Sequence, residues 1–284
     1  MYFPDIEVTK LTEQMSIEKG KGIALNRALK ENLFTCFTCI ENTVPLIIVG
    51  KPDTGKSLSF QILYNTLKGE YSEKEFFKKK GKLYRYYYQG SETSTAKGIK
   101  QVFKKALNAK NKVKNKKKKK EDEENEIKEE NENKIEEKEE NKIIEEKKEE
   151  KKGEKKEEEK SKNINLVFFD EMGLAERSSN NPLKVIHYLL EKDTEDSVPF
   201  LGISNWRLDA AKINRALNLS ITDYDIQDLE ETAYAIAYAL DSNLSNEYQD
   251  FFKALARTYN DYHIIMTIYK IFIFFSLTLN FSLS

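Results

Sequence analysis

The chain has 284 residues, of which 33% are charged, and its formal net charge at pH 7 is −1. This balance argues against a dedicated nucleic-acid surface, and the lysines at 116–120 do not alter it, because an acidic block follows them directly. Two cysteines exclude a disulfide scaffold. The first residues show no charged region followed by an apolar core, so we expect no secretory signal and a cytoplasmic protein.

Apolar side chains recur at helical spacing over residues 23–40 and predict a helix with one broad buried stripe. This helix belongs to a lead-in that we expect to occupy residues 1–44. Its cysteines, Cys36 and Cys39, have the C-x-x-C spacing of half a zinc site or of a redox pair. Zinc would need two further ligands, and the two histidines of the chain stand far apart, so we interpret both thiols as core residues.

A phosphate-binding loop follows this lead-in. Residues 45–49 form a short apolar run that predicts a strand buried on both faces, and a complete G-x-x-x-x-G-K-S pattern occupies 50–57. Residues 58–68 predict a helix that ends at Gly69. Strand, glycine loop and helix N-terminus surround one small volume with backbone N–H groups and the positive end of a helix dipole, which suits a triphosphate. The strand and helix on either side disfavour a chance match.

Individual residues of this loop have distinct expected roles. Lys56 can reach the β- and γ-phosphates of ATP, and the Ser57 hydroxyl can ligate Mg²⁺. The glycines let the backbone wrap closely around the phosphates. The expected nucleotide-binding residues are Gly50, Pro52, Asp53, Thr54, Gly55, Lys56, Ser57 and Leu58.

The next segment carries a strand, a helix and a long charged insertion. Residues 82–89 are rich in aromatic side chains and predict a second strand, after which Ser94 or Thr95 can cap a helix that runs to about residue 107. From 108 to 163 the chain is almost only Lys, Glu and Asn, which buries too little apolar surface to offset the entropy of ordering it. We interpret 108–163 as a solvated insertion, disordered or at most partly helical.

An acidic pair follows the third predicted strand, which spans residues 164–169. Asp170 can orient water on Mg²⁺, and Glu171 can polarise the water that attacks the γ-phosphate. A solvated turn at a strand end is the alternative interpretation. The complete phosphate loop upstream favours the functional one.

Beyond the acidic pair, Asn181 is expected to cap a helix that begins at Pro182, and His187 inside it is interpreted as a packed residue rather than a ligand. Residues 198–204 predict a fourth strand. Asn205 stands at its carboxyl end, where an amide can read the γ-phosphate. An Asx turn before the tryptophan is the alternative role of Asn205.

The last third of the chain predicts one more strand and several helices. Asp209 can cap a short helix that contains Arg215, and 217–221 can form a fifth strand. A capped helix over 225–240 follows, and then a further helix over roughly 247–259. The expected buried face of the first of these consists of Leu229, Ala233, Ile236 and Ala237.

Alternating helices and strands with short links predict an α/β fold, in which a parallel sheet is covered on both faces. We expect the core at 45–222, and a helical lid with an apolar C-terminal end at 223–284. The apolar run at 264–283 is long enough to span a bilayer, but Lys270 and Asn280 interrupt it, so a membrane anchor is the less favoured alternative.

The loop at 50–57, the acidic pair at 170–171, Asn205 and Arg215 resemble, in this order, an AAA+ ATPase module of the P-loop NTPase class. The resemblance implies a sheet of strand order 5-1-4-3-2 and a partial helical lid. Two specific strings, D-E-M-G-L-A-E at 170–176 and G-I-S-N-W at 202–206, resemble the mysterin family, which are giant AAA+ ubiquitin ligases with a RING finger. The likeness runs from about residue 23 to 262, apart from the insertion.

The resemblance implies ATP and Mg²⁺ as cofactors, ATP hydrolysis as the activity, and neighbouring modules of a dynein-like ring, or self-association, as contacts. Ubiquitin-pathway partners follow from the family only, because two cysteines cannot build a cross-braced zinc domain. Arg215 resembles the arginine that contacts nucleotide in a neighbouring module, with a surface ion pair as its alternative role. A nucleotide-gated scaffold with little or no hydrolysis is the alternative function.

Overall fold

The computed structural model describes residues 5–17, 21–52, 54–115, 163–191, 197–240 and 248–262, together with 264 and 266. Its strands are β1 (Leu46–Val49), β2 (Leu83–Gln89), β3 (Ile164–Asp170), β4 (Phe200–Ser204) and β5 (Leu217–Ser220). Its helices are α1 (Asp5–Thr12), α2 (Arg27–Glu41), α3 (Lys56–Thr66), α4 (Glu75–Lys78), α6 (Met172–Glu176), α7 (Lys184–Leu189), α8 (Ala210–Ile213) and α9 (Ile226–Leu240), with a 3-10 turn η1 (Gly69–Tyr71). Residues 96–115 and 249–262 are also helical.

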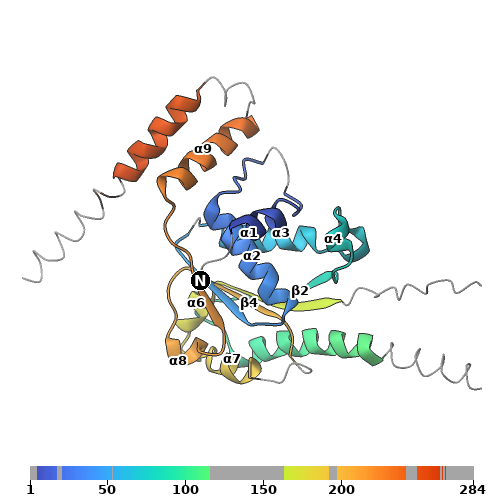
Figure 1. Ribbon diagram of the computed structural model, residues 1–284. Coiled ribbons are helices and arrows are strands. Elements are labelled where there is room, and N and C mark those ends of the chain that lie inside the picture. Colours follow the sequence, from blue (N-terminus) through green and yellow to red (C-terminus); the bar gives the residue numbers. More distant parts are fainter. Residues whose placement is uncertain are drawn as a thin grey trace, which may run out of the picture.

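The five strands form one sheet of order β2-β3-β4-β1-β5, and every neighbouring pair is parallel. This is the predicted order 5-1-4-3-2, which is confirmed. Figure 1 shows α1 to α4 on one face of the sheet and α6, α7, α8 and the helix of residues 96–115 on the other. Parallel strands need such crossover helices, which cover both faces.

Side-chain alternation along the buried strands explains two separate cores. On β1, Leu46 and Ile48 pack in the cluster that includes α2 and α3, whereas Ile47 and Val49 pack in the cluster with the helices of the opposite face. β3 divides in the same way, with Phe168 in the first cluster and Phe169 in the second. Successive strand residues point to opposite faces, so a strand between two helical layers must be apolar throughout.

Helix α2 begins later than predicted, at Arg27, because Asn26 caps it by accepting a hydrogen bond from the backbone N–H of Leu29 at 2.9 Å. The core role predicted for its cysteines is confirmed, since both thiols are buried. Burial raises the pKa of Cys39 to about 11 and that of Cys36 higher still, so both remain protonated at neutral pH. Within the part of the chain that the structure describes, no group of three or more potential metal ligands occurs.

Several local predictions were wrong. Asn181 does not cap α7, because it adopts a left-handed conformation with φ 44° and the helix starts three residues later, after Leu183. Arg215 lies in a turn beyond α8 rather than inside a helix. The helix expected to stop near residue 107 continues to 115, into the predicted insertion, whose residues 116–162 lie outside the described part.

Figure 1 shows α9 and the helix of residues 249–262 side by side and apart from the sheet. Their role as a lid stays a prediction. Arg257 and Glu230 form an ion pair between them at 3.5 Å. Of the face predicted to be buried, Ala237 is buried and Leu229 and Ala233 are half-buried, but Ile236 is 49% exposed. The described helices include none that is long and apolar enough to cross a membrane, and the run at 264–283 lies almost wholly outside them.

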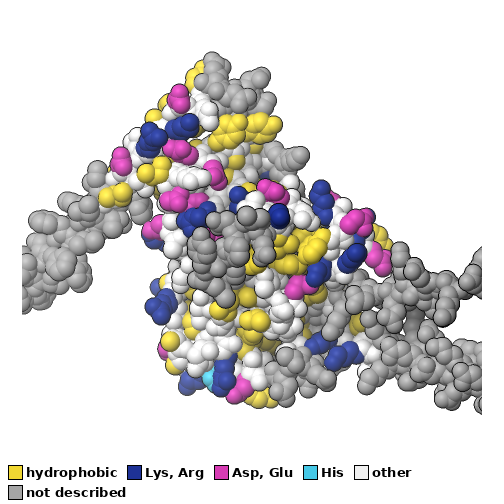
Figure 2. Space-filling model, in the orientation of Figure 1, with side chains coloured by type: hydrophobic (Ala, Val, Ile, Leu, Met, Phe, Trp, Pro, Cys, Tyr) yellow, Lys and Arg dark blue, Asp and Glu magenta, His cyan; other side chains and the backbone are white. Residues whose placement is uncertain are grey.

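On the face shown in Figure 2, basic and acidic side chains are interspersed rather than gathered by sign. A protein that neutralises many phosphates of a nucleic acid needs a concentrated basic surface. The visible face therefore agrees with the near-zero net charge of the sequence.

Candidate nucleotide-binding site

The glycine loop joins β1 to α3 at the carboxyl edge of the sheet. Gly55 is the residue before α3 and has φ 76°, a left-handed conformation that glycine adopts without a steric penalty. No side chain caps the first turn of α3. The N–H groups of a first turn have no partner inside the helix, so this end of α3 is suited to an anion.

Lys56 lies inside the loop and is only 6% exposed. Its ammonium group donates to the backbone oxygen of Gly50 at 2.8 Å and to that of Lys51. The Thr54 hydroxyl donates to the same Lys51 oxygen at 2.8 Å, which holds the curve of the loop. The cation of Lys56 is thus held where the loop backbone surrounds it.

The other predicted loop residues differ in exposure. Ser57 is exposed in the first turn of α3, and Pro52 is also exposed. Leu58 is half-buried and packs against the core cluster around α2 and α3. Asp53 lies outside the described residues. The loop thus presents a hydroxyl to solvent at the same helix end that carries the lysine.

The acidic pair stands at the end of β3, two strands away from β1. One carboxylate oxygen of Asp170 accepts the backbone N–H of Glu171 at 3.0 Å. Glu171 has φ 51°, a left-handed conformation that is uncommon for a residue with a side chain. Such a backbone persists only where surrounding contacts hold it, and these conformations are concentrated at functional sites.

Asn205 and Glu171 meet at this edge of the sheet. The side-chain nitrogen of Asn205 lies 3.1 Å and 3.3 Å from the two carboxylate oxygens of Glu171, so the amide donates to the carboxylate. They can meet because Asn205 follows β4 and Glu171 follows β3, which are adjacent parallel strands. Both residues were predicted for the site, but their mutual hydrogen bond was not.

Two glycines near the acidic pair were missed by the sequence analysis. Gly173 faces the indole ring of Trp206, where an added Cβ would lie 2.6 Å from ring atoms, and the Arg177 guanidinium stacks 4.4 Å from the ring centre. Gly90 follows β2 and donates its N–H to the backbone oxygen of Asp170 at 2.8 Å. Gly173 lies in the D-E-M-G-L-A-E string, whereas the only signal for Gly90 is its position directly after a strand.

The segment between β5 and α9 borders the loop. A Cβ added at Gly50 would lie 3.0 Å from the Cβ of Ile221, and the ammonium of Lys51 pairs with Asp223 at 2.7 Å. A Cβ at Gly55 would lie 3.8 Å from the Tyr224 hydroxyl. The chain that leads into α9 therefore contacts the loop at three points along its length.

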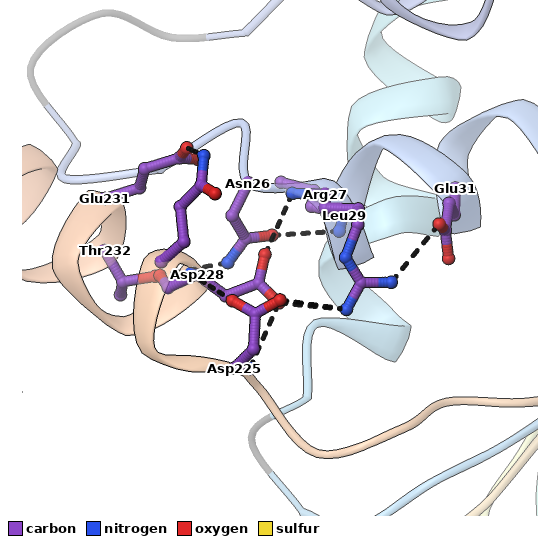
Figure 3. Close-up of polar contacts among 9 residues, drawn as sticks. Asn26, Arg27, Leu29, Glu31, Asp225, Asp228, Glu231 and Thr232 are labelled. Atoms are coloured by element: carbon purple, nitrogen blue, oxygen red, sulfur yellow. Dashed lines mark hydrogen bonds and ion pairs between the residues drawn. The ribbon is translucent and has the colours of Figure 1, made fainter. Parts of the chain in front are cut away.

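Figure 3 shows a polar cluster that joins α9 to the start of α2. Asp228 is 2% exposed, and its two carboxylate oxygens accept the backbone N–H of Arg27 at 3.0 Å and the guanidinium of Arg27 at 3.4 Å. The Asn26 amide donates to the Thr232 hydroxyl at 3.2 Å. Partial burial lowers the pKa of the Arg27 guanidinium, but the nearby carboxylates have the larger combined effect, so this pKa is raised.

Arg215 forms an ion pair with Glu191 at 2.9 Å and donates to the His187 ring at 3.4 Å. About half of each charged side chain of the pair is exposed to solvent. This is the surface ion pair that was one of the two predicted roles of Arg215. A contact with a neighbouring module stays a prediction, and so does the packed role of His187, which is half-buried.

A parallel sheet of this strand order, with a glycine loop after β1 and an acidic pair after β3, defines an AAA+ module of the P-loop α/β class. Comparison with known proteins agrees: the model of the RNF213 AAA domain matches residues 22–133 and 134–228. The chain therefore belongs to this family, and RNF213 is another name for mysterin, so the resemblance drawn from the sequence is confirmed.

The relatives are much longer proteins. The E3 ubiquitin-protein ligase rnf213-beta of Danio rerio is 33% identical over 229 residues, which cover 78% of this chain but 4% of that protein. The E3 ubiquitin-protein ligase RNF213 of Homo sapiens is 29% identical over 246 residues, and that of Mus musculus is 29% identical over 245. In both, the match covers 84% of this chain and 4% of the relative.

Proposed function

We propose that this chain binds ATP with Mg²⁺ and hydrolyses ATP as one AAA+ module of a mysterin-like ring. The observation that carries the proposal is the hydrogen bond of Asn205 to Glu171, at 3.1 Å, on the same sheet edge as the phosphate loop. An amide that holds a carboxylate keeps a general base ready and oriented. The left-handed backbone of Glu171, which surrounding contacts must hold in place, supports the same role.

The donor groups present suit a nucleoside triphosphate with Mg²⁺. The uncapped first turn of α3 and the cation of Lys56 match phosphate oxygens. Mg²⁺ prefers oxygen ligands and usually keeps several bound waters. The Ser57 hydroxyl and the Asp170 carboxylate offer oxygen atoms that can bind the ion directly or accept hydrogen bonds from its waters. When bound, Mg²⁺ supplies neutralisation of charge on the phosphates.

The remaining roles belong to residues at the strand ends. Glu171 would accept the proton of the attacking water, and Asn205 would orient that carboxylate or the γ-phosphate. Arg215 would act in trans, on nucleotide held by a neighbouring module, after exchanging its partner Glu191 for a phosphate. The loop residues Gly50, Pro52, Thr54, Gly55 and Leu58, with Asp53 outside the described part, complete the proposed binding set.

ATP turnover and ATP affinity test this proposal. Lys56→Ala should abolish tight ATP binding, and Glu171→Gln should retain binding while lowering turnover by roughly 100-fold or more, because general-base catalysis contributes about that much. Lys68→Ala and Glu70→Gln make the same replacements at exposed positions beyond the far end of α3, so they are matched controls and should leave both unchanged. Turnover that is unchanged in both site variants would contradict the proposal.

A nucleotide-gated scaffold is the second candidate function. It is favoured by the contacts of the loop with the segment before α9, such as Lys51 with Asp223 at 2.7 Å, which can transmit nucleotide occupancy to the helices. Tight ATP binding without turnover, even after self-association, would support this alternative over hydrolysis.

The partners that we propose are neighbouring AAA+ modules or further copies of this chain. Ubiquitin-pathway proteins are proposed only through the family, because the relatives are named as E3 ubiquitin-protein ligases and this chain spans 4% of their length. We assign the ligase chemistry to other parts of such proteins, since this chain has two cysteines, both in α2. A cytoplasmic site of action, where ATP and Mg²⁺ are plentiful, is part of the same proposal.

A further inference from the structure

The end of the edge strand β2 lies directly beside the acidic pair. β2 pairs with β3 along its full length, with Tyr87 opposite Phe168 and Gln89 opposite Asp170. Because strand side chains alternate between faces, Tyr87 and Gln89 share a face of the sheet. The ring of Tyr87 is 5.8 Å from that of Phe168, which stacks at 4.0 Å on Phe60 of α3. This face is therefore the one that α3 covers.

The Tyr87 hydroxyl is held beside the acidic pair through Gln89. It donates to the side-chain oxygen of Gln89 at 2.6 Å, and Gln89 stands opposite Asp170 in the strand register. Partial burial, and then the nearby charge of Asp170, raise the pKa of this phenol.

The ring of Tyr87 is held although 42% of the residue is exposed. The guanidinium of Arg85 lies 5.3 Å from the centre of this ring and 5.5 Å from the ring of Tyr64 on α3. Cation–π contacts of this kind stabilise the placement of exposed rings. The ring is thus held by Phe168 of β3 and by Arg85 of its own strand.

Gly90, the residue after β2, contacts the backbone of the acidic pair. Its N–H donates to the Asp170 oxygen at 2.8 Å, and a Cβ at this position would lie 2.0 Å from the backbone oxygen of Glu171. Only glycine permits this approach, because any side chain would displace Glu171 from its left-handed conformation. Contacts from the end of β2 therefore reach the backbone of both acidic residues.

We propose that the end of β2 is a positioning element for the acidic pair: Tyr87, with Gln89, orients the Asp170 carboxylate, and Gly90 fixes the backbone of Glu171. The inference rests on the proposed function, because it concerns how the Asp170 carboxylate is oriented toward Mg²⁺ and the water bound to that ion. One Asp170 oxygen is already held by the Glu171 amide, and the proposed second restraint comes from Tyr87 through Gln89. Partners that orient metal ligands from outside strongly influence metal affinity.

The test is the Mg²⁺ dependence of ATP binding in Tyr87→Phe, measured by calorimetry on the full chain. We expect the Mg²⁺ concentration that gives half of the Mg²⁺-dependent gain in ATP affinity to rise on the order of 10-fold. ATP affinity in EDTA should not change. Tyr84→Phe is the matched control, because Tyr84 is on the same strand, points to the other face and has nearly the same exposure, 39% against 42%; it should behave as wild type.

The outcomes separate the inference from the proposed function. An unchanged Mg²⁺ dependence in Tyr87→Phe, or an equal change in Tyr84→Phe, overturns the inference alone. A wild-type chain that binds no ATP overturns the proposed function and the inference with it. A loss of ATP affinity in EDTA would show a general structural role for Tyr87 and would also contradict the positioning role.

Discussion

The sheet and the α9 region are held by different forces. Strand β1 is buried along its whole length, with Ile47 and Ile48 at 0% exposure. On α9, by contrast, Ile236 and Leu240 are 49% and 81% exposed, and the buried residues are Asp228 and Ala237. Apolar burial therefore dominates the stability of the sheet, whereas a polar cluster at one end attaches α9.

This difference suits a module that transmits a signal. The sheet must keep Glu171, Asn205 and the loop in fixed relation, and close packing resists displacement. The helices of 226–240 and 249–262 stand apart from the sheet in Figure 1, and elements placed in this way can change orientation at a smaller cost in free energy. Three tests probe the comparison, in order of decreasing expected effect. The first two are single substitutions with a control, and the third is a double-mutant cycle.

The largest effect is expected for Phe168→Ala in β3. This ring is 3% exposed and stacks on Phe60 at 4.0 Å, so its removal should lower the free energy of unfolding by about 3–5 kcal/mol. Phe251→Ala, in the helix of residues 249–262, should change it by less than about 0.5 kcal/mol, because Phe251 is 60% exposed. Urea unfolding measures both. Equal effects would show that the two regions are packed alike.

An intermediate effect is expected for Asp228→Ala. The substitution leaves the Arg27 N–H and part of its guanidinium without their acceptor, which should cost about 1.5–3 kcal/mol. Hydrogen exchange should increase mainly in α9 rather than in the sheet. Glu231→Ala is the control, since that carboxylate accepts from Gln227 of the same helix at 3.1 Å. Exchange that increases equally in the strands would contradict a local attachment.

The smallest effect is expected for the ion pair of Lys51 and Asp223. Its side chains are 61% and 55% exposed, so the coupling energy from a double-mutant cycle should be about 0–1 kcal/mol despite the 2.7 Å distance. It should also fall in 1 M salt, because exposed charges are screened. A coupling that is larger and insensitive to salt would show that the segment before α9 is attached more firmly than the rest of that region.

Local patterns in the sequence were sufficient to predict the strands and the loop. Residues 46–49 and 164–169 are continuous apolar runs, and such runs need burial on both sides whatever surrounds them. The glycine loop and the acidic pair follow those runs directly, so their place at the carboxyl edge follows from strand direction. The strand order itself came from the family resemblance and was confirmed by the sheet.

The sequence by itself determined which segments form the sheet and which residues stand at its carboxyl edge, because burial pattern and loop chemistry are local. Only the tertiary structure decided that Asn205 holds Glu171, that Gly90 must approach Glu171, and that Asp228 is buried against Arg27. These contacts join positions 34, 81 and 201 residues apart in the chain. Their existence depends on which elements pack together, and no local pattern contains that information.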